Sequence, residues 1–309
     1  MKLDNYLEKG DWAIETEHLS RRFGKLLTVD AIDLKVERGS IFGLLGVNGA
    51  GKTTLIKMLM GHLRPTAGKF TILGRSLKQE LVEIRKRVGY VSEDRYLYDW
   101  MTVAESLRFT RAFYENWDEQ KAAALIERFD LTLNQRVKQL SRGNRARLSL
   151  VLALSYNPEL ILLDEPTSGL DPIVRRDFIE NIISEIASRE RTVLFSSHIV
   201  EEIERIADHV GIIHEGRLIV SSEIDALKSS LKRIRFATNA SRPDLTGIPG
   251  VLRVDNADHD QIATLQGWSE ETLHWLRQRG VVDPEVLPMS LEEIFVELAG
   301  GTRERKVSA

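Results

Sequence analysis

One glycine-rich stretch, GVNGAGKTT at residues 46–54, constrains the fold of this chain more than any other. It matches the pattern G-x-x-x-x-G-K-[ST], follows the apolar run SIFGLLG (40–46) and precedes a helical pattern over 52–61. Glycines let the backbone wrap closely enough for successive N–H groups to point at phosphate oxygens, and the helix start adds its dipole. The stretch therefore predicts a strand, a phosphate-binding loop and a helix, which together open a nucleotide-binding α/β fold.

Within this loop we expect Lys52 to reach the β- and γ-phosphates and the Thr53 hydroxyl to ligate Mg²⁺. The other predicted nucleotide contacts are Gly46, Asn48, Gly49, Ala50, Gly51 and Thr54. A glycine-rich turn that precedes a lysine by chance is the alternative interpretation, and the strand–loop–helix context disfavours it.

The run LILLDEPTSGLDP (160–172) supplies two adjacent carboxylates where an apolar strand is expected to end. Asp164 would then lie at the edge of the sheet beside the phosphates and ligate Mg²⁺. Glu165 can polarise a water molecule for in-line attack on the γ-phosphate. Helix capping is the alternative role for acidic residues here, and it suits Asp171, which precedes a proline, best.

A third apolar run, TVLFSS (192–197), is followed by His198. Because neighbouring parallel strands end at the same edge of a sheet, we expect this imidazole in the crevice that holds Asp164. There it could hydrogen-bond the γ-phosphate or the attacking water, whereas a structural or merely exposed histidine is the alternative. We therefore assign catalysis to Glu165 and His198.

The stretch QLSRGNRARLSL (139–150) places Ser141, Gly143 and three arginines where an amphipathic helix is expected to begin. Ser141 fits an N-cap. The arginines do not fit such a start, because cations at a helix N-terminus oppose its dipole. An anion held in front of the helix would account for them.

The rest of the chain places these motifs in one α/β domain. Apolar runs alternate with helical patterns, as at 172–189 and 199–207, which favours a largely parallel sheet. The segments Ile14–Phe23 and Leu27–Val36 alternate more regularly and predict an antiparallel edge. Residues 100–157 read as wholly helical, so we expect a helical subdomain inserted into the sheet domain.

A second, smaller domain is expected at the C-terminal end. The strand-like GRLIVSS (216–222) and a helix near Glu223–Ser230 are expected to close the first domain, 12–230. The segment 231–300 predicts a small α+β accessory domain, and 301–309 predicts a polar, frayed tail. In the accessory domain, strands are predicted at 234–240 and 251–258, and helices at 270–279 and 290–298.

Composition excludes several classes of protein. The chain has no cysteine, which rules out a disulfide framework, thiol chemistry and zinc held by cysteine. Its 43 basic and 46 acidic residues give a net charge of −3, so no global field indicates nucleic acid as a partner. No stretch approaches the roughly 18 consecutive apolar residues of a membrane span, so we expect the chain to be soluble by itself.

Residues 12–230 resemble the nucleotide-binding subunit of ATP-binding cassette (ABC) transporters. Four motifs carry the resemblance and appear in the order and at the spacing of that family: the phosphate loop, LSRGN, LLDEPTSGLD and SSH. The resemblance implies a P-loop ATPase fold with a parallel core sheet, an antiparallel edge sheet and a helical subdomain, and it implies ATP and Mg²⁺ as ligands. It also implies a homodimer in which Ser141 and Gly143 of one chain close over Lys52 of its partner. The anion in front of the arginine-rich helix would then be ATP held by the partner.

Three further positions follow from the resemblance. Phe23, in RRFG, matches an aromatic residue that stacks on adenine, with a core phenylalanine as the alternative. Asp171 matches the loop that senses the opposite subunit. Glu93, in GYVSE, stands where the family has a glutamine, and its carboxylate can still ligate Mg²⁺. The signature differs from the common LSGGQ at Arg142 and Asn144, although the serine and second glycine are retained.

The resemblance also implies a partner in the membrane. The stretch DRYLYDWMTVAESL (94–107) gathers Tyr96, Leu97, Tyr98, Trp100 and Met101, either as a core patch or as the groove that receives a coupling helix of a membrane permease. The ending SLEEIFVELAGG resembles ATPase subunits of bacterial export systems whose permease is a separate chain. The implied function is ATP hydrolysis at the cytoplasmic face of the cell membrane, where dimer closure powers export.

Other classes of cassette protein remain as alternatives. A regulatory subunit that closes on nucleotide but hydrolyses it poorly is compatible with the altered signature. A soluble cassette ATPase acting on DNA or ribosomes is disfavoured, because the chain has no room for a long coiled-coil insertion and carries a single cassette. A P-loop kinase leaves LSRGN without a role.

Overall fold

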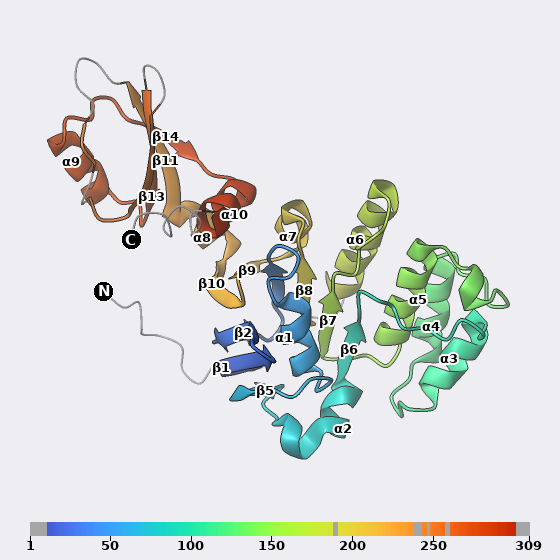
Figure 1. Cartoon of the computed structure of the whole chain (residues 1–309). Coiled ribbons are helices and arrows are strands. Elements are labelled where there is room, and N and C mark those ends of the chain that lie inside the picture. The colour runs from blue at the N-terminus through green and yellow to red at the C-terminus, as the bar shows by residue number, and fades with distance from the viewer. Residues whose placement is uncertain (1–10, 188–190, 238–242, 246–247, 257–259, 301–309) are drawn as a thin grey trace. The chain divides into compact units, whose positions relative to one another are not determined.

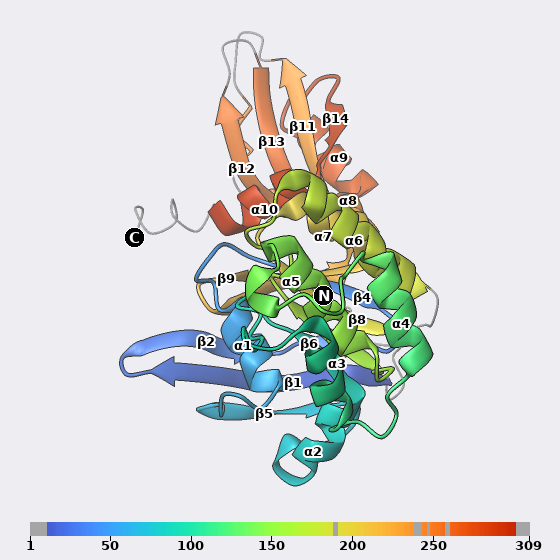
Figure 2. The same ribbon diagram turned by 90° about the vertical axis from the view of Figure 1, so that its right-hand side faces the viewer.

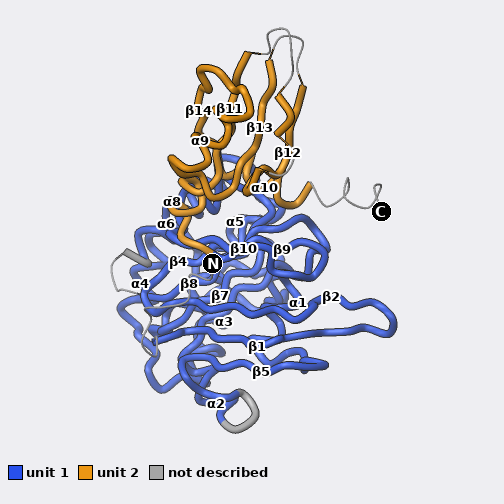
Figure 3. Tube along the Cα trace, turned by 90° about the vertical axis from the view of Figure 1, so that its left-hand side faces the viewer, with its two compact units in different colours: residues 1–221 blue, residues 222–309 orange. Residues whose placement is uncertain are grey.

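The computed structural model describes residues 11–187, 191–237, 243–245, 248–256 and 260–300 (Figure 1). The chain divides into two compact units, residues 1–221 and 222–309 (Figure 3). The sequence places this boundary later, after residue 230. The difference is the helix α8 (Ile224–Ser230), which packs against β11 (Leu231–Ala237) and α10 (Leu291–Gly300) and so belongs to the second unit.

A six-stranded sheet forms the core of the first unit, in the order β10-β9-β4-β8-β7-β6. The strands are β4 (Ile41–Leu45), β6 (Val88–Val91), β7 (Leu160–Asp164), β8 (Thr192–Ser197), β9 (His209–His214) and β10 (Arg217–Glu223). The pairs β4–β8, β4–β9, β7–β8 and β6–β7 are parallel. Every residue of β7 and β8 is buried, as expected for apolar runs at the centre of a parallel sheet.

A separate antiparallel sheet lies beside this core (Figure 2). It contains β1 (Trp12–Phe23), β2 (Leu26–Ile32), β3 (Lys35–Glu37) and β5 (Ala67–Ile72). The helix α1 (Lys52–Leu59) contacts both β2 and β7, so its apolar residues join the two sheets in one core. The predicted antiparallel edge sheet is present. The strand predicted at 27–36 is divided into β2 and β3, and β5 was not predicted.

Three α-helices and a short 3-10 turn form the predicted helical subdomain: α3 (Val103–Arg111), α4 (Glu119–Arg128), the turn Val137–Gln139 and α5 (Arg142–Leu154). Each α-helix begins with a side-chain cap, from Thr102, Asp118 and Ser141. Helix α5 contacts α3 and α4 and also contacts β6 and α6 (Pro172–Ala187). It therefore connects the subdomain with the sheet. The remaining helices of this unit are α2 (Leu77–Arg87) and α7 (Val200–Ile206).

The second unit is a four-stranded antiparallel sheet, ordered β12-β13-β11-β14, with its own apolar core. Its strands are β11, β12 (Val251–Asn256), β13 (Asp260–Gln266) and β14 (Glu285–Pro288), and its remaining helix is α9 (Glu270–Gln278). Ile234 and Phe236 of β11 pack with Leu276 of α9. The predicted α+β character is observed, with two strands, β13 and β14, that the sequence pattern did not indicate.

Some predicted ends lie outside the described residues. These are the last residues of the helix predicted at 172–189, the ends of the strands predicted at 234–240 and 251–258, and the tail 301–309. Within the described part of the chain, no helix is both long enough and apolar enough to cross a bilayer.

Candidate functional site

The loop between β4 and α1 is shaped by glycines in the left-handed region. Gly49 has φ +82° and Gly51 has φ +110°. A Cβ added at Gly51 would lie 2.6 Å from the carbonyl oxygen of Thr28, so only glycine fits there without a shift of the backbone. Gly51 is also the N-cap of α1, and its position provides no side-chain cap for the first helical N–H groups. These donors are therefore available to an anion.

A cavity of about 300 Å³ opens at this loop. Its lining residues are Thr28, Asn48, Gly49, Ala50, Gly51, Lys52, Thr53, Thr54, Glu93 and Glu165. The structure thus brings together the predicted nucleotide contacts with the exception of Gly46 and Phe23, and it adds two of the predicted acidic residues. Thr28, on β2, was not predicted, because it is far from the loop in sequence and carries no motif that indicates this contact.

Lys52 is buried and makes its contacts inside the site. Its Nζ donates to the carbonyl oxygen of Gly46 at 2.6 Å and lies 3.0 Å from Oε1 of Glu165. Both side chains of this ion pair are only 5% exposed. The ion pair holds the end of this side chain beside the open helix start, where the phosphates of a nucleotide would be.

Asp164 ends β7 and connects three elements. Its Oδ1 accepts hydrogen bonds from the Thr53 hydroxyl on α1 and the Ser196 hydroxyl on β8, each at 3.0 Å. Its Oδ2 is buried and has no hydrogen-bond partner among the described residues. Burial raises the pKa of this carboxyl to about 6, against the lowering effect of the two hydroxyl donors.

These groups fit a magnesium ion. Within the described residues no cluster of three or more histidine or acidic side chains could hold a metal alone. Mg²⁺ needs less than this, because it retains several waters and takes oxygens from one or two side chains and from substrate phosphates. Asp164, with its unpaired buried Oδ2, and the Thr53 hydroxyl beside it would supply the side-chain part of such a site.

Glu165 follows directly and joins the same network. It has φ +47°, a conformation that non-glycine residues seldom adopt, and its N–H donates to the Ser196 hydroxyl at 3.0 Å. Its Oε2 lies 2.7 Å from Nδ1 of His198, which follows β8. Its Oε1 has the ion pair with Lys52 and no hydrogen bond in the described structure. The carboxylate is therefore held from both sides.

Glu93 lies in the loop after β6, at the edge of the cavity. Its Oε1 accepts a hydrogen bond from the Ser168 hydroxyl at 3.2 Å. Its negative charge, with that of Glu165, adds to the rise in the pKa of Asp164. The site thus holds three carboxylates near one buried lysine, an arrangement in which a divalent cation would relieve repulsion.

The LSRGN helix start is arranged differently. The Ser141 hydroxyl accepts a hydrogen bond from the N–H of Asn144 at 3.1 Å, which makes it the N-cap of α5. Two of the three arginines have carboxylate partners in the same chain: Arg145 pairs with Asp99 and Arg147 with Asp177. Arg145 and Arg147 therefore do not need an external anion to balance their charge, and Arg142 is exposed.

Gly143, Asp171 and Phe23 also lie away from the lining of the cavity. A Cβ at Gly143 would lie 2.7 Å from Cγ1 of Val174, so this glycine allows α5 to approach α6. The carbonyl oxygen of exposed Asp171 accepts from the N–H of Arg175, as a residue at a helix start does. Phe23 is 43% exposed, which contradicts the alternative of a core residue, and the Arg21 guanidinium lies 4.5 Å from its ring centroid.

The chain is similar to known proteins. The family model described as ABC transporter matches residues 29–168. The daunorubicin resistance ATP-binding protein DrrA3 of Streptomyces coeruleorubidus is 36% identical over 97% of this chain and 99% of its own length. The ABC transporter ATP-binding protein YtrB of Bacillus subtilis is 30% identical over 94% of this chain and 99% of its own length. The chain belongs to the ABC transporter ATP-binding family.

Other ABC proteins match in part or in fold. The probable multidrug ABC transporter ATP-binding protein YbhF of Escherichia coli is 36% identical over 77% of this chain, which spans 40% of YbhF's length. A solved ATP-binding subunit of an ABC transporter aligns with a TM-score of 0.65 at 29% identity, covering 70% of this chain and 92% of its own. The dimeric cassette MJ0796 has a TM-score of 0.62 at 20% identity over 68% of this chain and 98% of its own, which shows the fold. The predicted fold class and ABC family are confirmed.

Proposed function

We propose that this chain is the ATP-hydrolysing subunit of an ABC exporter whose permease is a separate protein. One observation carries the proposal. Five side chains converge at one edge of the sheet, beside a cavity of about 300 Å³. They come from the start of a helix and from the ends of two parallel strands, and they are Lys52, Thr53, Asp164, Glu165 and His198. This set provides anion binding, cation ligands and a base in one place.

Nucleotide binding would begin at the open start of α1. The uncapped N–H groups and Lys52 Nζ would bind the phosphates. Thr53 and Asp164 would hold Mg²⁺, which neutralises charge on the phosphates when bound. Phe23, exposed at the end of β1, would offer its ring to adenine.

The ion pair of Lys52 suggests how Glu165 becomes available for chemistry. In this structure Lys52 Nζ lies 3.0 Å from Oε1, while His198 holds Oε2 at 2.7 Å. When the γ-phosphate attracts Lys52, Oε1 is freed to orient a water molecule, and His198 keeps the carboxylate in position. Nucleotide binding and preparation of the base would thus be one event.

The partner cassette would supply what the cavity of one chain lacks. Ser141, Gly143 and Asp171 do not line that cavity, so any contact they make with ATP needs a second chain. The solved cassette MJ0796 is dimeric, and we carry this arrangement over to the present chain as part of the proposal. ATP would favour the closed dimer, and hydrolysis would remove this preference.

A second cavity of about 290 Å³ would receive the permease. It is lined in part by Tyr90, Arg95, Tyr96 and Leu97, and we call it the groove. Beside it in sequence, the exposed rings of Tyr98, Trp100, Phe109 and Phe113 form a chain of aromatic contacts. Met101 is buried and Leu97 is partly buried, so the core alternative applies to these two residues. Exposed aromatic surface of this kind marks a docking site, here for a membrane protein at the cytoplasmic face.

The direction of transport is proposed from relatives. DrrA3 is named for daunorubicin resistance, YbhF for multidrug transport and BcrA of Bacillus licheniformis for bacitracin transport. BcrA is 33% identical over 93% of this chain and 97% of its own length. We infer export of a drug or another toxic compound.

The decisive experiment is ATP turnover of the Glu165→Gln variant. We expect Mg²⁺-dependent hydrolysis by the unchanged chain, its loss in Glu165→Gln, and retained ATP binding with a stable dimer seen by light scattering. Glu201→Gln, an exposed acid on α7, is the matched control. Turnover in Glu165→Gln equal to the unchanged chain would contradict the proposal. Slow single-turnover hydrolysis in the unchanged chain would favour the regulatory alternative instead.

The membrane partner is tested separately. We expect a multi-span membrane protein to co-purify with the chain from detergent-solubilised membranes, and to be lost when Trp100 and Phe113 are changed to alanine. Retention of the same protein by that double variant would place the contact elsewhere.

A further inference from the structure

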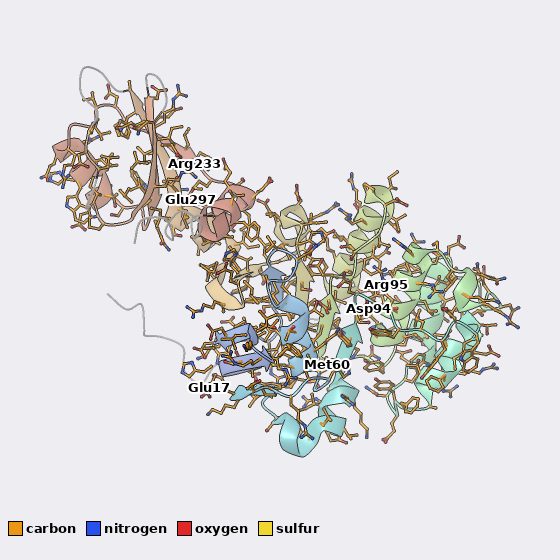
Figure 4. All side chains as sticks on the ribbon, viewed as in Figure 1. Glu17, Met60, Asp94, Arg95, Arg233 and Glu297 are labelled. Carbon is orange, nitrogen blue, oxygen red and sulfur yellow. The ribbon has the colours of Figure 1, made fainter. Side chains whose placement is uncertain are left out.

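Arg21 covers one face of the Phe23 ring. The central carbon of its guanidinium lies 4.5 Å from the centroid of the ring. Both residues lie on β1, the strand that also carries Glu17 (Figure 4). In the stretch RRFG the resemblance to the family gives a role to Phe23 and none to Arg21. The contact between the two side chains indicates what Arg21 does.

The guanidinium is held against the ring by a bond to another segment. Its Nη1 donates to the carbonyl oxygen of Arg64 at 2.7 Å, in the segment between α1 and β5 that begins at Met60 (Figure 4). Its Nε is buried and has no hydrogen-bond partner among the described residues. A buried donor without a partner costs free energy, and the contact with the π-electrons of Phe23 offsets part of that cost.

The backbone on both sides of Arg21 is fixed as well. The ladder between β1 and β2 is irregular at Arg21, and Thr66 supplies the bonds there. The N–H of Thr66 donates to the carbonyl oxygen of Ser20 at 2.8 Å, and its hydroxyl accepts from the N–H of Arg22 at 3.0 Å. Arg21 thus has a fixed backbone and a fixed tip, so it can hold the ring that lies against it.

A ring held on one face can stack on a base with the other. Phe23 is 43% exposed, and its free face is therefore open to a ligand. A ring already held in one orientation loses less side-chain freedom when a base binds. The guanidinium charge also draws π-electron density toward itself, which makes the opposite face less negative toward an electron-rich purine.

The contacts of Arg21 do not favour a direct bond to a phosphate. Its Nη1 is already bonded to a carbonyl oxygen, and its Nε is buried. Arg21 is also absent from the lining of the cavity at the phosphate loop. Its effect on a nucleotide would therefore pass through the ring to the base.

We propose that Arg21 is a positioning residue for base recognition, which holds the Phe23 ring and so strengthens the stacking of adenine on it. The inference rests on the proposed nucleotide binding. Arg21 adds to the affinity for a nucleotide and not to the affinity for its phosphates alone, and this difference makes the proposal testable.

The first test compares ADP with pyrophosphate, which has no base, by titration calorimetry with Mg²⁺. In Arg21→Ala we expect the Kd for ADP to rise by roughly 3- to 10-fold, the effect of losing a partly buried cation–π contact. The Kd for pyrophosphate should stay within about twofold, because the phosphate-binding groups lie elsewhere. ADP is used because the chain cannot hydrolyse it to a product that would disturb the titration.

Two further variants control this result. Arg22→Ala is the matched control, because Arg22 is the next residue and its Nη1 also donates to a backbone carbonyl, that of Lys25 at 3.2 Å. It should leave both Kd values unchanged. Arg21→Lys retains a cation that can lie over the ring, and should restore most of the affinity for ADP. Thermal unfolding of each variant shows whether the fold is retained.

The second test is a double-mutant cycle with the ring. Phe23→Ala removes the group through which Arg21 acts. In that background Arg21→Ala should change the Kd for ADP by less than about twofold, although it raises the Kd when Phe23 is present. A role of Arg21 in folding alone would not depend on Phe23. This cycle also decides the question if pyrophosphate binds too weakly to be titrated.

The outcomes separate the proposals. An unchanged Kd for ADP in Arg21→Ala overturns the positioning role. Equal losses of affinity for ADP and pyrophosphate, or an equal effect of Arg21→Ala with and without Phe23, also overturn it, because Arg21 would then act on the phosphates or on the fold. Absence of any binding of ADP or ATP to the unchanged chain is instead a failure of the proposed function.

Discussion

The starts of α1 and α5 are both rich in glycine and positive charge, yet the structure uses them in opposite ways. At α1 the cap is a left-handed glycine without a side-chain hydrogen bond, and the nearest cation, Lys52, is buried beside an open cavity. At α5 the cap is Ser141, whose hydroxyl is bonded to the helix backbone. Two of its three arginines are paired with carboxylates of the same chain.

The difference shows which helix start can bind an anion within one chain. An N-terminus attracts anions when its N–H groups are free and no nearby side chain satisfies them. The start of α1 meets this condition, and the start of α5 meets it only in part. A ligand at α5 must therefore bring further contacts, and in the proposed dimer these come from the other subunit.

The largest effect is expected at Lys52. Lys52→Ala should weaken Mg²⁺–ATP binding by roughly 10- to 100-fold, because a hydrogen bond to a charged group contributes about 1.5–3 kcal/mol. Arg145→Ala, at the other helix start, should change ATP affinity of the single chain less than about twofold, because Arg145 is paired with Asp99. Titration calorimetry measures both. An equal loss of ATP affinity in the two variants would contradict the proposed difference between the two helix starts.

The next prediction concerns the free energy of unfolding and the carboxyl group of Asp164, beside α1. Asp164 has a pKa raised to about 6 by burial, so folding is favoured by its protonated form. That stability is present below the ordinary pKa of 3.8 and is lost as pH rises through about 6. Without nucleotide and metal at about pH 7, Asp164→Asn should therefore stabilise the fold by roughly 1–3 kcal/mol. This range follows because a tenfold change in proton affinity corresponds to about 1.4 kcal/mol, and the unpaired amide of the asparagine offsets part of the gain.

The control for this prediction lies on the α5 side. Asp177 is half exposed and pairs with Arg147, so Asp177→Asn should change stability by less than about 1 kcal/mol, and in the destabilising direction. Chemical denaturation at several pH values measures both. The gain in Asp164→Asn should vanish below about pH 4, because Asp164 is then protonated in both states. A gain that is constant with pH would show that charge is not its cause.

An effect of similar size is expected where α5 meets α6. The added Cβ of Gly143→Ala would lie 2.7 Å from Val174, and overpacking of this kind costs about 1–3 kcal/mol. Val174→Ala in the same chain should restore stability, because it removes the methyl group that clashes. Thermal unfolding and ATP turnover of the double variant are then compared. We expect turnover to stay low; its recovery together with stability would make Gly143 a packing residue alone.

Much of the α1 site could be predicted because its chemistry is local in sequence or follows from strand order. The glycines, Lys52 and Thr53 are consecutive, and the positions of Asp164 and His198 follow from the rule that parallel strands end at one edge. The helical subdomain could also be predicted, because residues 100–157 carry helical patterns, and α3, α4 and α5 lie within this range.

What the sequence did not reveal depends on contacts between distant segments. Thr28 reaches the cavity through a hairpin, and Arg95 binds carbonyls of Pro166 and Ser168, which carry no side-chain signal of such a bond. The carboxylate partners of Arg145 and Arg147 are 46 and 30 residues away. Because the sequence does not reveal these carboxylate partners, the arginines at the start of α5 indicated an external anion.

The smallest effect is the most specific test of α5. Ser141→Ala removes the cap of this helix and should cost about 1 kcal/mol of stability, while ATP affinity of the single chain is unchanged. Ser141→Thr retains a hydroxyl and should restore most of that stability.

In the Glu165→Gln background, ATP-driven dimerisation is then measured by light scattering. If the hydroxyl only caps the helix, dimerisation follows stability in both variants. We expect Ser141→Ala to weaken the dimer more than its loss of stability explains, because a hydroxyl that already accepts from Asn144 can still donate to a phosphate across the interface.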